Sequence, residues 1–245
     1  MTAELLHTRD VTAAALPLVV DGLRRAVALR GRASLVLAGG STPLPLYRRL
    51  AAVDLPWERV HFVWGDERRV PVTDANSNAR SALEALVDRV GVPEENVHLW
   101  PLLPSGEAAA AAYQGALEAA LGPEPVFDVT LLGLGDDGHT ASLFPRTGAA
   151  LAGSFALATT APSGAAVAER LSLGARTLSR SRLVVFLVQG AGKAAAVAAT
   201  FGAGAPDVGE GPPWSPEAAL EVDAHPAMAV TALERLVVVT DVDLA

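Results

Sequence analysis

Apolar residues recur along this chain with two spacings that alternate. Between residues 13 and 29 they return every three or four positions, as at Leu16, Val19 and Leu23, which predicts an amphipathic helix. The next segment, ASLVL (33–37), is a continuous apolar run that ends near a pair of glycines, and such a run is typical of a buried strand. A second helical pattern follows over residues 44–52.

The same alternation continues to residue 241. Further strands are predicted at RVHFVW, NVHLWPL, FDVTLLG, AERLSLG, RLVVFLV and RLVVVTD. Further helices are predicted over 77–90, over 107–121, beyond the loop that follows FDVTLLG, and directly after Lys193. Val- and Leu-rich strands that alternate with helices indicate a mostly parallel sheet with helices on both faces. We therefore predict one Rossmann-like α/β domain over residues 1–245, with a mobile Gly- and Pro-rich loop at 202–216.

Four polar loops follow predicted strands, at 39–43, 65–80, 133–145 and 189–193. In an open α/β sheet, ligands bind where the loops leave the carboxyl ends of the strands. The four loops are therefore expected to line one crevice.

The first loop combines the flexible Gly39 and Gly40 with the hydroxyl residues Ser41 and Thr42 at the start of a predicted helix. Free backbone N–H groups and hydroxyl donors at a helix start suit a phosphate monoester. The glycine and lysine pattern of a Walker loop is absent. An equally good interpretation is an ordinary strand-to-helix turn, with Ser41 or Thr42 as the helix cap and Pro43 at the first helical position.

The basic residues are used unevenly. Of the 19 Lys and Arg residues, 18 are Arg and one is Lys193. Lys193 follows two glycines at the start of a predicted helix, where the helix dipole disfavours a cation. A bound phosphate would remove that penalty, so we favour a phosphate-binding role over a solvated lysine.

The third loop, GLGDDGHTASLFP, carries a Gly133-x-Gly135-x-x-Gly138 pattern that resembles a dinucleotide-binding fingerprint. Asp136 and Asp137 would repel the pyrophosphate, and no acidic residue for a ribose follows about twenty positions on. Hydride transfer is therefore disfavoured. What remains is His139 beside carboxylates that can orient it as a general base, against the alternative of a helix-capping histidine. His7, His61, His98 and His225 are assigned structural roles.

The second loop, GDERRVPVTDANSNAR, is dense in hydrogen-bonding side chains, among them Asp66, Arg68 and Asn78. Such a stretch suits a sugar with many hydroxyls, and an arginine there can stabilise a developing oxyanion. The alternative is a solvated loop in which Ser77 caps the next helix. No metal-ligand spacing and no G-x-S-x-G serine esterase motif is present.

The composition and net charge of the chain exclude some classes of binding partner. The net charge of −8 argues against nucleic-acid or membrane-surface binding. The apolar fraction of 51% is inflated by alanine, and the longest apolar run, 183–188, is far short of the roughly 20 residues that span a bilayer. No secretory signal is visible, and the absence of cysteine suits the cytoplasm. We expect a cytoplasmic monomer.

Three segments, LAGGSTPLPLY, WGDERRVP with SNAR, and LLGLGDDGHTASLFP, together resemble 6-phosphogluconolactonase, a hydrolase of the oxidative pentose phosphate pathway. The resemblance extends over about residues 36–200 and implies the sugar-phosphate isomerase/deaminase-like fold. In the related glucosamine-6-phosphate deaminases the third segment typically reads DGHIAFNEP, so Thr140, Ser142, Leu143 and Phe144 favour the lactonase branch. Residues 202–232 depart from the family pattern, and their contribution is left open.

The resemblance implies hydrolysis of a phosphorylated sugar lactone without a cofactor or metal. His139 would be the general base and Arg68 the partner of the carbonyl oxygen. The remaining residues of the implied site are Gly40, Ser41, Thr42, Asp66, Asn78, Asp137, Arg170 and Lys193, among which Gly40, Ser41, Thr42, Arg170 and Lys193 would hold the phosphate. The alternatives are a deaminase and a non-catalytic sugar-phosphate-binding protein on the same fold.

Overall fold

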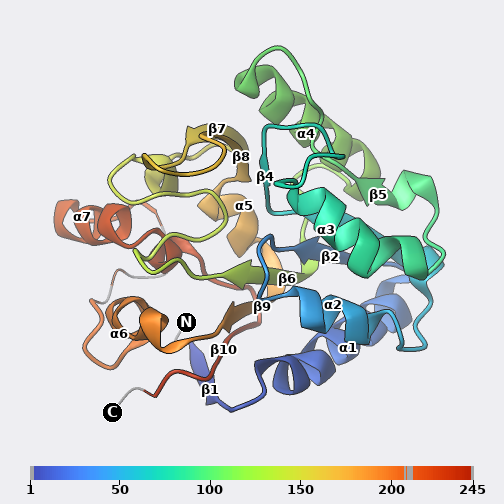
Figure 1. The fold of residues 1–245 in the computed structure, drawn as a ribbon, viewed down its shortest axis with the longest axis horizontal. Coiled ribbons are helices and arrows are strands. Elements are labelled where there is room, and N and C mark those ends of the chain that lie inside the picture. Colours follow the sequence, from blue (N-terminus) through green and yellow to red (C-terminus); the bar gives the residue numbers. More distant parts are fainter. Residues whose placement is uncertain (1–2, 207, 209–211, 244–245) are drawn as a thin grey trace.

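Strands that are far apart in the sequence lie side by side in one central sheet (Figure 1). The structure is a computed structural model, and it describes residues 3–206, 208 and 212–243. Seven strands form the sheet in the order β1-β10-β9-β6-β2-β3-β5, and every neighbouring pair is parallel. The bounds are β1 Glu4–His7, β2 Ala33–Leu37, β3 Val60–Trp64, β5 Val97–His98, β6 Phe127–Gly133, β9 Ser181–Val188 and β10 Arg235–Thr240. The predicted parallel α/β fold is confirmed.

Helices cover both faces of this sheet, and the strands supply each face with alternate residues. Val185 and Val237 pack into one hydrophobic cluster, whereas their chain neighbours Val184 and Val238 pack into a second cluster on the opposite face. The first cluster is covered by α1 Val11–Arg30, α2 Leu44–Leu50 and α3 Asn78–Ala85. The second is covered by α4 Gly106–Leu121, α5 Ala175–Ser179, α6 Ala194–Phe201 and α7 Pro216–Ala224. Burial on both faces explains why these strands are continuous apolar runs.

Short 3₁₀ turns complete the main elements: η1 Trp57–Arg59, η2 Val87–Arg89, η3 Glu94–Asn96, η4 Ala149–Leu151, η5 Ala191–Lys193 and η6 Pro226–Ala229. The helix predicted over 77–90 is thus an α-helix with Ser77 as its N-cap, followed by a 3₁₀ turn. In the described part of the chain, none of the helices has the length and hydrophobicity that a membrane crossing requires.

A second, three-stranded antiparallel sheet stands apart from the first and packs against α4 (Figure 1). Its order is β4-β8-β7, with β4 Asp66–Arg68, β7 Ala156–Thr160 and β8 Glu169–Leu173. The AERLSLG strand was expected among the parallel strands and belongs here instead. Part of the predicted 65–80 loop is likewise strand β4. The alternation of strands and helices along the sequence does not distinguish the two sheets. An apolar pattern indicates which residues are buried, but it does not indicate which strands form hydrogen bonds with each other.

The helix expected after the loop that follows β6 is absent from the described residues, and that prediction was wrong. Only the 3₁₀ turn η4 forms there. Gly138, Ala141, Arg146 and Gly148 all have left-handed backbone conformations, with φ of 86°, 48°, 60° and 71°. A right-handed helix cannot pass through such residues. Of the 202–216 loop, residues 207 and 209–211 lie outside the described residues, so its predicted mobility stays a prediction.

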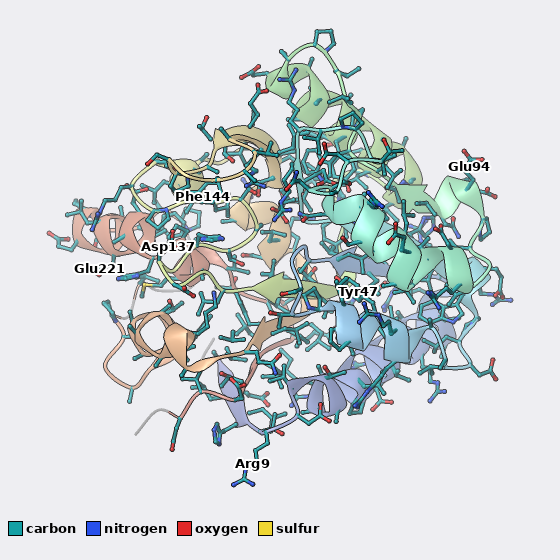
Figure 2. All side chains as sticks on the ribbon, in the orientation of Figure 1. Arg9, Tyr47, Glu94, Asp137, Phe144 and Glu221 are labelled. Carbon is teal, nitrogen blue, oxygen red and sulfur yellow. The ribbon has the colours of Figure 1, made fainter. Side chains whose placement is uncertain are left out.

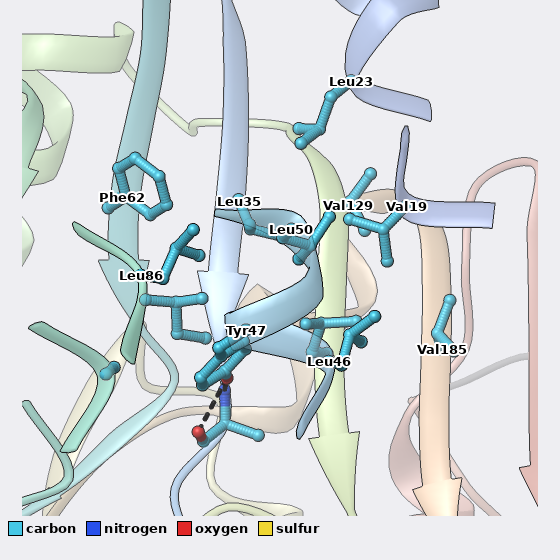
Figure 3. Packing of buried hydrophobic residues seen from close by; sticks show 14 of the residues in the cluster. Val19, Leu23, Leu35, Leu46, Tyr47, Leu50, Phe62, Leu86, Val129 and Val185 are labelled. Atoms are coloured by element: carbon cyan, nitrogen blue, oxygen red, sulfur yellow. Dashed lines mark hydrogen bonds between the residues drawn. The ribbon is translucent and has the colours of Figure 1, made fainter. Parts of the chain in front are cut away.

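Tyr47 of α2 ties the end of β2 to the helix that follows the first polar loop. Its ring is fully buried in the first cluster, as Figure 3 shows. The Tyr47 hydroxyl donates to the backbone oxygen of Ala38 at 2.8 Å and accepts from the Ala38 N–H at 2.9 Å. Because both Ala38 backbone groups are paired in this way, the chain enters the Gly39-Gly40 turn in a fixed direction.

Two half-buried histidines form a pair on neighbouring strands, at a distance from the polar loops. His61 Nδ1 of β3 lies 3.1 Å from His98 Nε2 of β5, and the rings are stacked. Burial, followed by the nearby charge of His61, lowers the pKa of His98 to about 4, and burial with Arg32 also lowers the pKa of His61. The folded protein therefore holds this pair neutral below the pH at which the unfolded chain takes up protons.

We expect this pair to make the protein sensitive to acid. Its stability contribution is present above about pH 6.5, the ordinary pKa, and is lost as the pH falls through the folded value of about 4. Urea unfolding at pH 7.5 and at pH 5.0 measures the effect. His98→Gln, which keeps a polar group beside His61, is expected to lose less stability between the two pH values than the unsubstituted protein. An equal loss in both proteins would contradict the assignment.

Candidate active site

The four polar loops meet at the carboxyl ends of β2, β3, β6 and β9, beside the point where the strand order reverses between β2 and β6. They enclose a cavity of about 210 Å³. Its polar and glycine lining comprises Gly39, Gly40, Thr42, Gly65, Asp66, Arg68, Asn78, Gly133, Gly135, His139, Gln189 and Lys193. His139 and Lys193, which stand far apart in the sequence, thus face one space.

A second cavity of about 310 Å³ adjoins the first and shares the wall formed by Asp66, Arg68, His139 and Ala141. Its other lining residues are Asp137, Ser142, Phe144, Ala161, Pro162, Ser163, Ala165 and Arg170. The predicted site residues therefore divide between the two spaces. The first cavity takes Gly40, Thr42, Asp66, Arg68, Asn78, His139 and Lys193, the second alone takes Asp137 and Arg170, and neither is lined by Ser41.

His139 is held by a carboxylate two residues before it. Its Nδ1 lies 2.6 Å from Asp137 Oδ1, and its backbone N–H donates to the same oxygen at 3.1 Å. Partial burial acts to raise the pKa of Asp137, but these hydrogen bonds and the attraction of His139 outweigh it, and the pKa lies below its ordinary value. An ionised Asp137 accepts a hydrogen bond from His139 Nδ1–H, and this leaves the Nε2 lone pair of the imidazole for a substrate or water.

The loop around this pair is tight and leaves room for no further atom at Gly135. Gly135 donates its N–H to the His139 oxygen at 2.8 Å, and Gly138 donates to the Gly135 oxygen at 3.1 Å. A Cβ atom added to Gly135 would lie 2.1 Å from His139 Nδ1 and 2.5 Å from Asp137 Oδ1. On its other side, the His139 ring packs against Phe144 at 5.1 Å between ring centroids. Figure 2 labels Asp137 and Phe144 in this region of the molecule.

Asp66 is a buried carboxylate with fixed partners, 8% exposed at the wall shared by both cavities. It accepts from the Ser142 hydroxyl at 2.6 Å and from the Asn78 side-chain amide at 3.2 Å. Asn78 in turn packs against the Cα of Gly39, where an added Cβ would lie 2.1 Å from its side-chain oxygen. These contacts join the first three polar loops, since Gly39, Asp66 and Ser142 come from different ones.

Glu67, the neighbour of Asp66, stabilises the N-terminus of α3. Its carboxylate accepts from the backbone N–H groups of Asn78 and Ala79 at 2.7 and 2.8 Å, at the N-terminus of α3. Burial raises the pKa of Glu67 despite these hydrogen bonds. The carboxylate thereby fixes the start of α3 against β4 and places Asn78 beside Asp66.

Lys193 lines the first cavity and contacts the loop that carries His139. Its Nζ lies 2.5 Å from the Oδ1 atom of Asp136, the residue before Asp137. The Lys193 side chain is 27% exposed, whereas that of Asp136 is 73% exposed. The cation at the start of α6 is therefore already paired, by a carboxylate rather than by a phosphate.

Arg68 and Arg170 lie opposite each other on the antiparallel strands β4 and β8. Both line the second cavity. Burial lowers the pKa of Arg170, and the charge of Arg68 lowers it further, against the opposing effect of Asp66 and Glu67. The Nε atoms of Arg68 and Arg170 are buried without a hydrogen-bond partner among the residues that the structure describes. The paired guanidinium groups suit a negatively charged or polarised oxygen.

The segment after residue 202 forms hydrogen bonds with the loop that carries His139. The Ala227 N–H donates to the Gly138 oxygen at 3.1 Å. At the C-terminal end of α7, Asp223 accepts from the N–H groups of Arg146 and Gly148, at 2.7 and 2.8 Å. The described part of this segment lines neither cavity. Its contribution is therefore support of the loop. Across the described residues, no group of three or more His, Asp or Glu side chains is arranged to hold a metal ion.

The family model described as glucosamine-6-phosphate isomerases/6-phosphogluconolactonase matches residues 7–225. The chain belongs to this family. A 6-phosphogluconolactonase of Synechocystis sp. is 41% identical over 202 residues, which cover 80% of this chain and 83% of that protein. The crystal structure of a 6-phosphogluconolactonase from Thermotoga maritima superposes with a TM-score of 0.81 at 29% identity, over 98% of both chains. The resemblance inferred from the sequence is confirmed.

A monomeric glucosamine-6-phosphate deaminase has the same fold, with a TM-score of 0.76 over 98% of this chain. At 19% identity the likeness shows shared architecture alone. Within this family, the site also contains residues to which the sequence reasoning gave no role, chiefly Gly135 and Ser142. Gly135 carried a signal, a glycine four residues before the histidine, but it was considered only as part of a nucleotide motif. Ser142 has no local signal, because its partner Asp66 lies on strand β4, far away in the sequence.

Proposed function

We propose that this chain hydrolyses 6-phospho-D-glucono-1,5-lactone to 6-phospho-D-gluconate, the reaction of the oxidative pentose phosphate pathway for which its lactonase relatives are named. The observation that carries the proposal is that His139, paired with Asp137, lines the same cavity as Lys193. A base and an ammonium that face one cavity suit a lactone that carries a phosphate. The absence of cysteine suits a cytoplasmic enzyme, and we infer that it acts as a monomer.

In this mechanism His139 Nε2 takes a proton from water as the water oxygen attacks C1 of the lactone. Asp137 stabilises the imidazolium that forms. Arg68, in the wall shared by both cavities, donates to the carbonyl oxygen as negative charge develops on it. The C1–O5 bond of the tetrahedral intermediate then breaks, and the imidazolium returns its proton to the O5 leaving group. Bonds and protons balance without a covalent enzyme intermediate.

The phosphate would lie in the first cavity, on Gly40, Thr42 and Lys193. Ser41 was assigned to this group but lines neither cavity. Arg170 was assigned to the phosphate as well, yet it lines the other cavity beside Arg68. We therefore give Arg170 to the lactone end, where it adds positive charge near the carbonyl oxygen and the carboxylate of the product.

Removal of the Lys193 ammonium by Lys193→Ala is expected to raise KM for the phosphorylated lactone and to change kcat less. An ammonium that holds the phosphate equally in the ground state and the transition state contributes to binding but not to the chemical step. Steady-state kinetics over a wide range of lactone concentration measure both constants. An unchanged KM would remove Lys193 from the phosphate site.

The decisive experiment is an assay on freshly prepared 6-phosphogluconolactone, corrected for spontaneous hydrolysis. Rapid enzyme-dependent hydrolysis supports the proposal. Ammonia release from glucosamine 6-phosphate without lactone hydrolysis would favour the deaminase alternative, and binding of 6-phosphogluconate without either activity would favour a sugar-phosphate-binding protein. Ser142 bonded to Asp66 and Phe144 packed on His139 tie the residues that distinguish the lactonase branch to this site.

A further inference from the structure

The contact between Lys193 and Asp136 places a carboxylate on the ammonium to which the phosphate was assigned. Asp136 stands in the turn between Gly135 and Gly138, which the Gly138-to-Gly135 backbone hydrogen bond closes. Its neighbour Asp137 holds His139 in the same turn. One carboxylate of this dipeptide thus holds His139, and the other pairs with Lys193, which lines the first cavity with His139.

We propose that Asp136 competes with the substrate phosphate for Lys193 and thereby weakens the binding of phosphorylated ligands. This inference rests on the proposed function in one respect, the assignment of the phosphate to Lys193. An ammonium paired at 2.5 Å is already partly neutralised by its carboxylate, and that carboxylate repels an incoming phosphate at close range.

The exposure of the pair shows why the exchange is feasible. With Asp136 73% exposed, its attraction to Lys193 is screened by water and salt. A phosphate monoester carries up to two negative charges near neutral pH and also accepts hydrogen bonds from backbone N–H groups. It therefore displaces the carboxylate but binds less tightly than it would to a free ammonium.

The phosphate is present in both the substrate and the product of the reaction. Asp136 opposes the binding of both by the same amount, because the phosphate is not changed by the reaction. Weaker uniform binding raises KM and speeds product release, and it does not alter the chemical step. Asp136 would thus lower the affinity of the site for the phosphorylated substrate and product alike.

The test is Asp136→Asn, which keeps the shape of the side chain and removes its charge. Calorimetric titration with 6-phosphogluconate and with inorganic phosphate gives the Kd of each ligand. We expect both to bind about 2–5-fold more tightly, the range set by an exposed ion pair. Asp136→Glu, which restores a carboxylate, is expected to bind like the unsubstituted protein. Asp88→Asn on η2, where the Asp88 side chain is exposed, controls for the change in net charge.

A role for Asp136 as an anchor that positions Lys193 predicts the opposite sign, since its removal would weaken phosphate binding. Weaker binding, or a Kd unchanged within error, overturns the proposal. The titrations need no turnover, so they stand apart from the lactonase assay. If the protein fails to hydrolyse the lactone, the proposed function fails while the competition is still tested. If hydrolysis proceeds but the Kd does not fall, only the competition is wrong.

Discussion

His139→Ala is expected to lower kcat for hydrolysis of 6-phosphogluconolactone by about 10²–10⁴-fold, the usual contribution of a general base. In the proposed mechanism the imidazole accepts a proton from water through Nε2, because Nδ1 lies 2.6 Å from Asp137 Oδ1. Phosphate binding is expected to persist, because the proposed phosphate site is formed by Gly40, Thr42 and Lys193 and not by His139. Stopped-flow or pH-stat measurements of hydrolysis, with the spontaneous rate subtracted, give kcat.

The matched control is His7→Ala, since His7 lies on the exposed edge strand β1 and lines neither cavity. It is expected to leave kcat unchanged. Calorimetry with 6-phosphogluconate shows whether His139→Ala still binds the product. Near-normal turnover of His139→Ala, once contaminating activity is removed, would contradict the assignment of His139 as the general base.

Gly135→Ala is expected to cost about 10²-fold in kcat although it changes no polar group. The new methyl would overlap His139 Nδ1 at 2.1 Å and His139 Cε1 at 2.4 Å, so the ring and Asp137 have to move. A displacement of about 1 Å in a catalytic group costs on the order of 10²-fold in rate. Steady-state kinetics measure this loss, and the melting temperature shows that the fold persists.

Gly115→Ala serves as the control for adding a methyl group at a glycine. Gly115 lies in α4, and a Cβ there meets no atom within 4 Å. Alanine is the better helix former by roughly 1 kcal/mol, so this variant is expected to be at least as stable and fully active. If Gly135→Ala retained the kcat of Gly115→Ala, the close packing of Gly135 against the imidazole would have no catalytic importance.

The sequence predicts the central strands well because burial on both faces makes them continuous apolar runs. β2, β6, β9 and β10 were all found for this reason. The strands that were missed lack apolar runs, and β4 lacks one because its three residues are Asp, Glu and Arg although two of them are buried. β1 is exposed at all of its residues and β7 is only partly buried, so neither has a core face that would set its pattern.

The sequence predicts those parts of the candidate site that lie in loops at the carboxyl ends of the parallel strands. The loops holding Gly40, His139 and Lys193 could be brought together by that rule alone. The position of Arg170 could not, because β8 belongs to the smaller sheet and its pairing with β4 is a long-range contact. The Lys193–Asp136 contact was missed for a related reason, since each residue was considered with its own loop.

The support that residues 223 and 227 give to the His139 loop bears on how the enzyme matures. On the ribosome, the segment that contains the base leaves the exit tunnel long before the backbone groups that secure it have been translated. Gly138, Arg146 and Gly148 then lack the partners that they have in the finished molecule. A nascent chain that extends only as far as β9 lacks these hydrogen bonds, so we expect the His139 loop to be secured only after residues 223 and 227 have been translated and have packed.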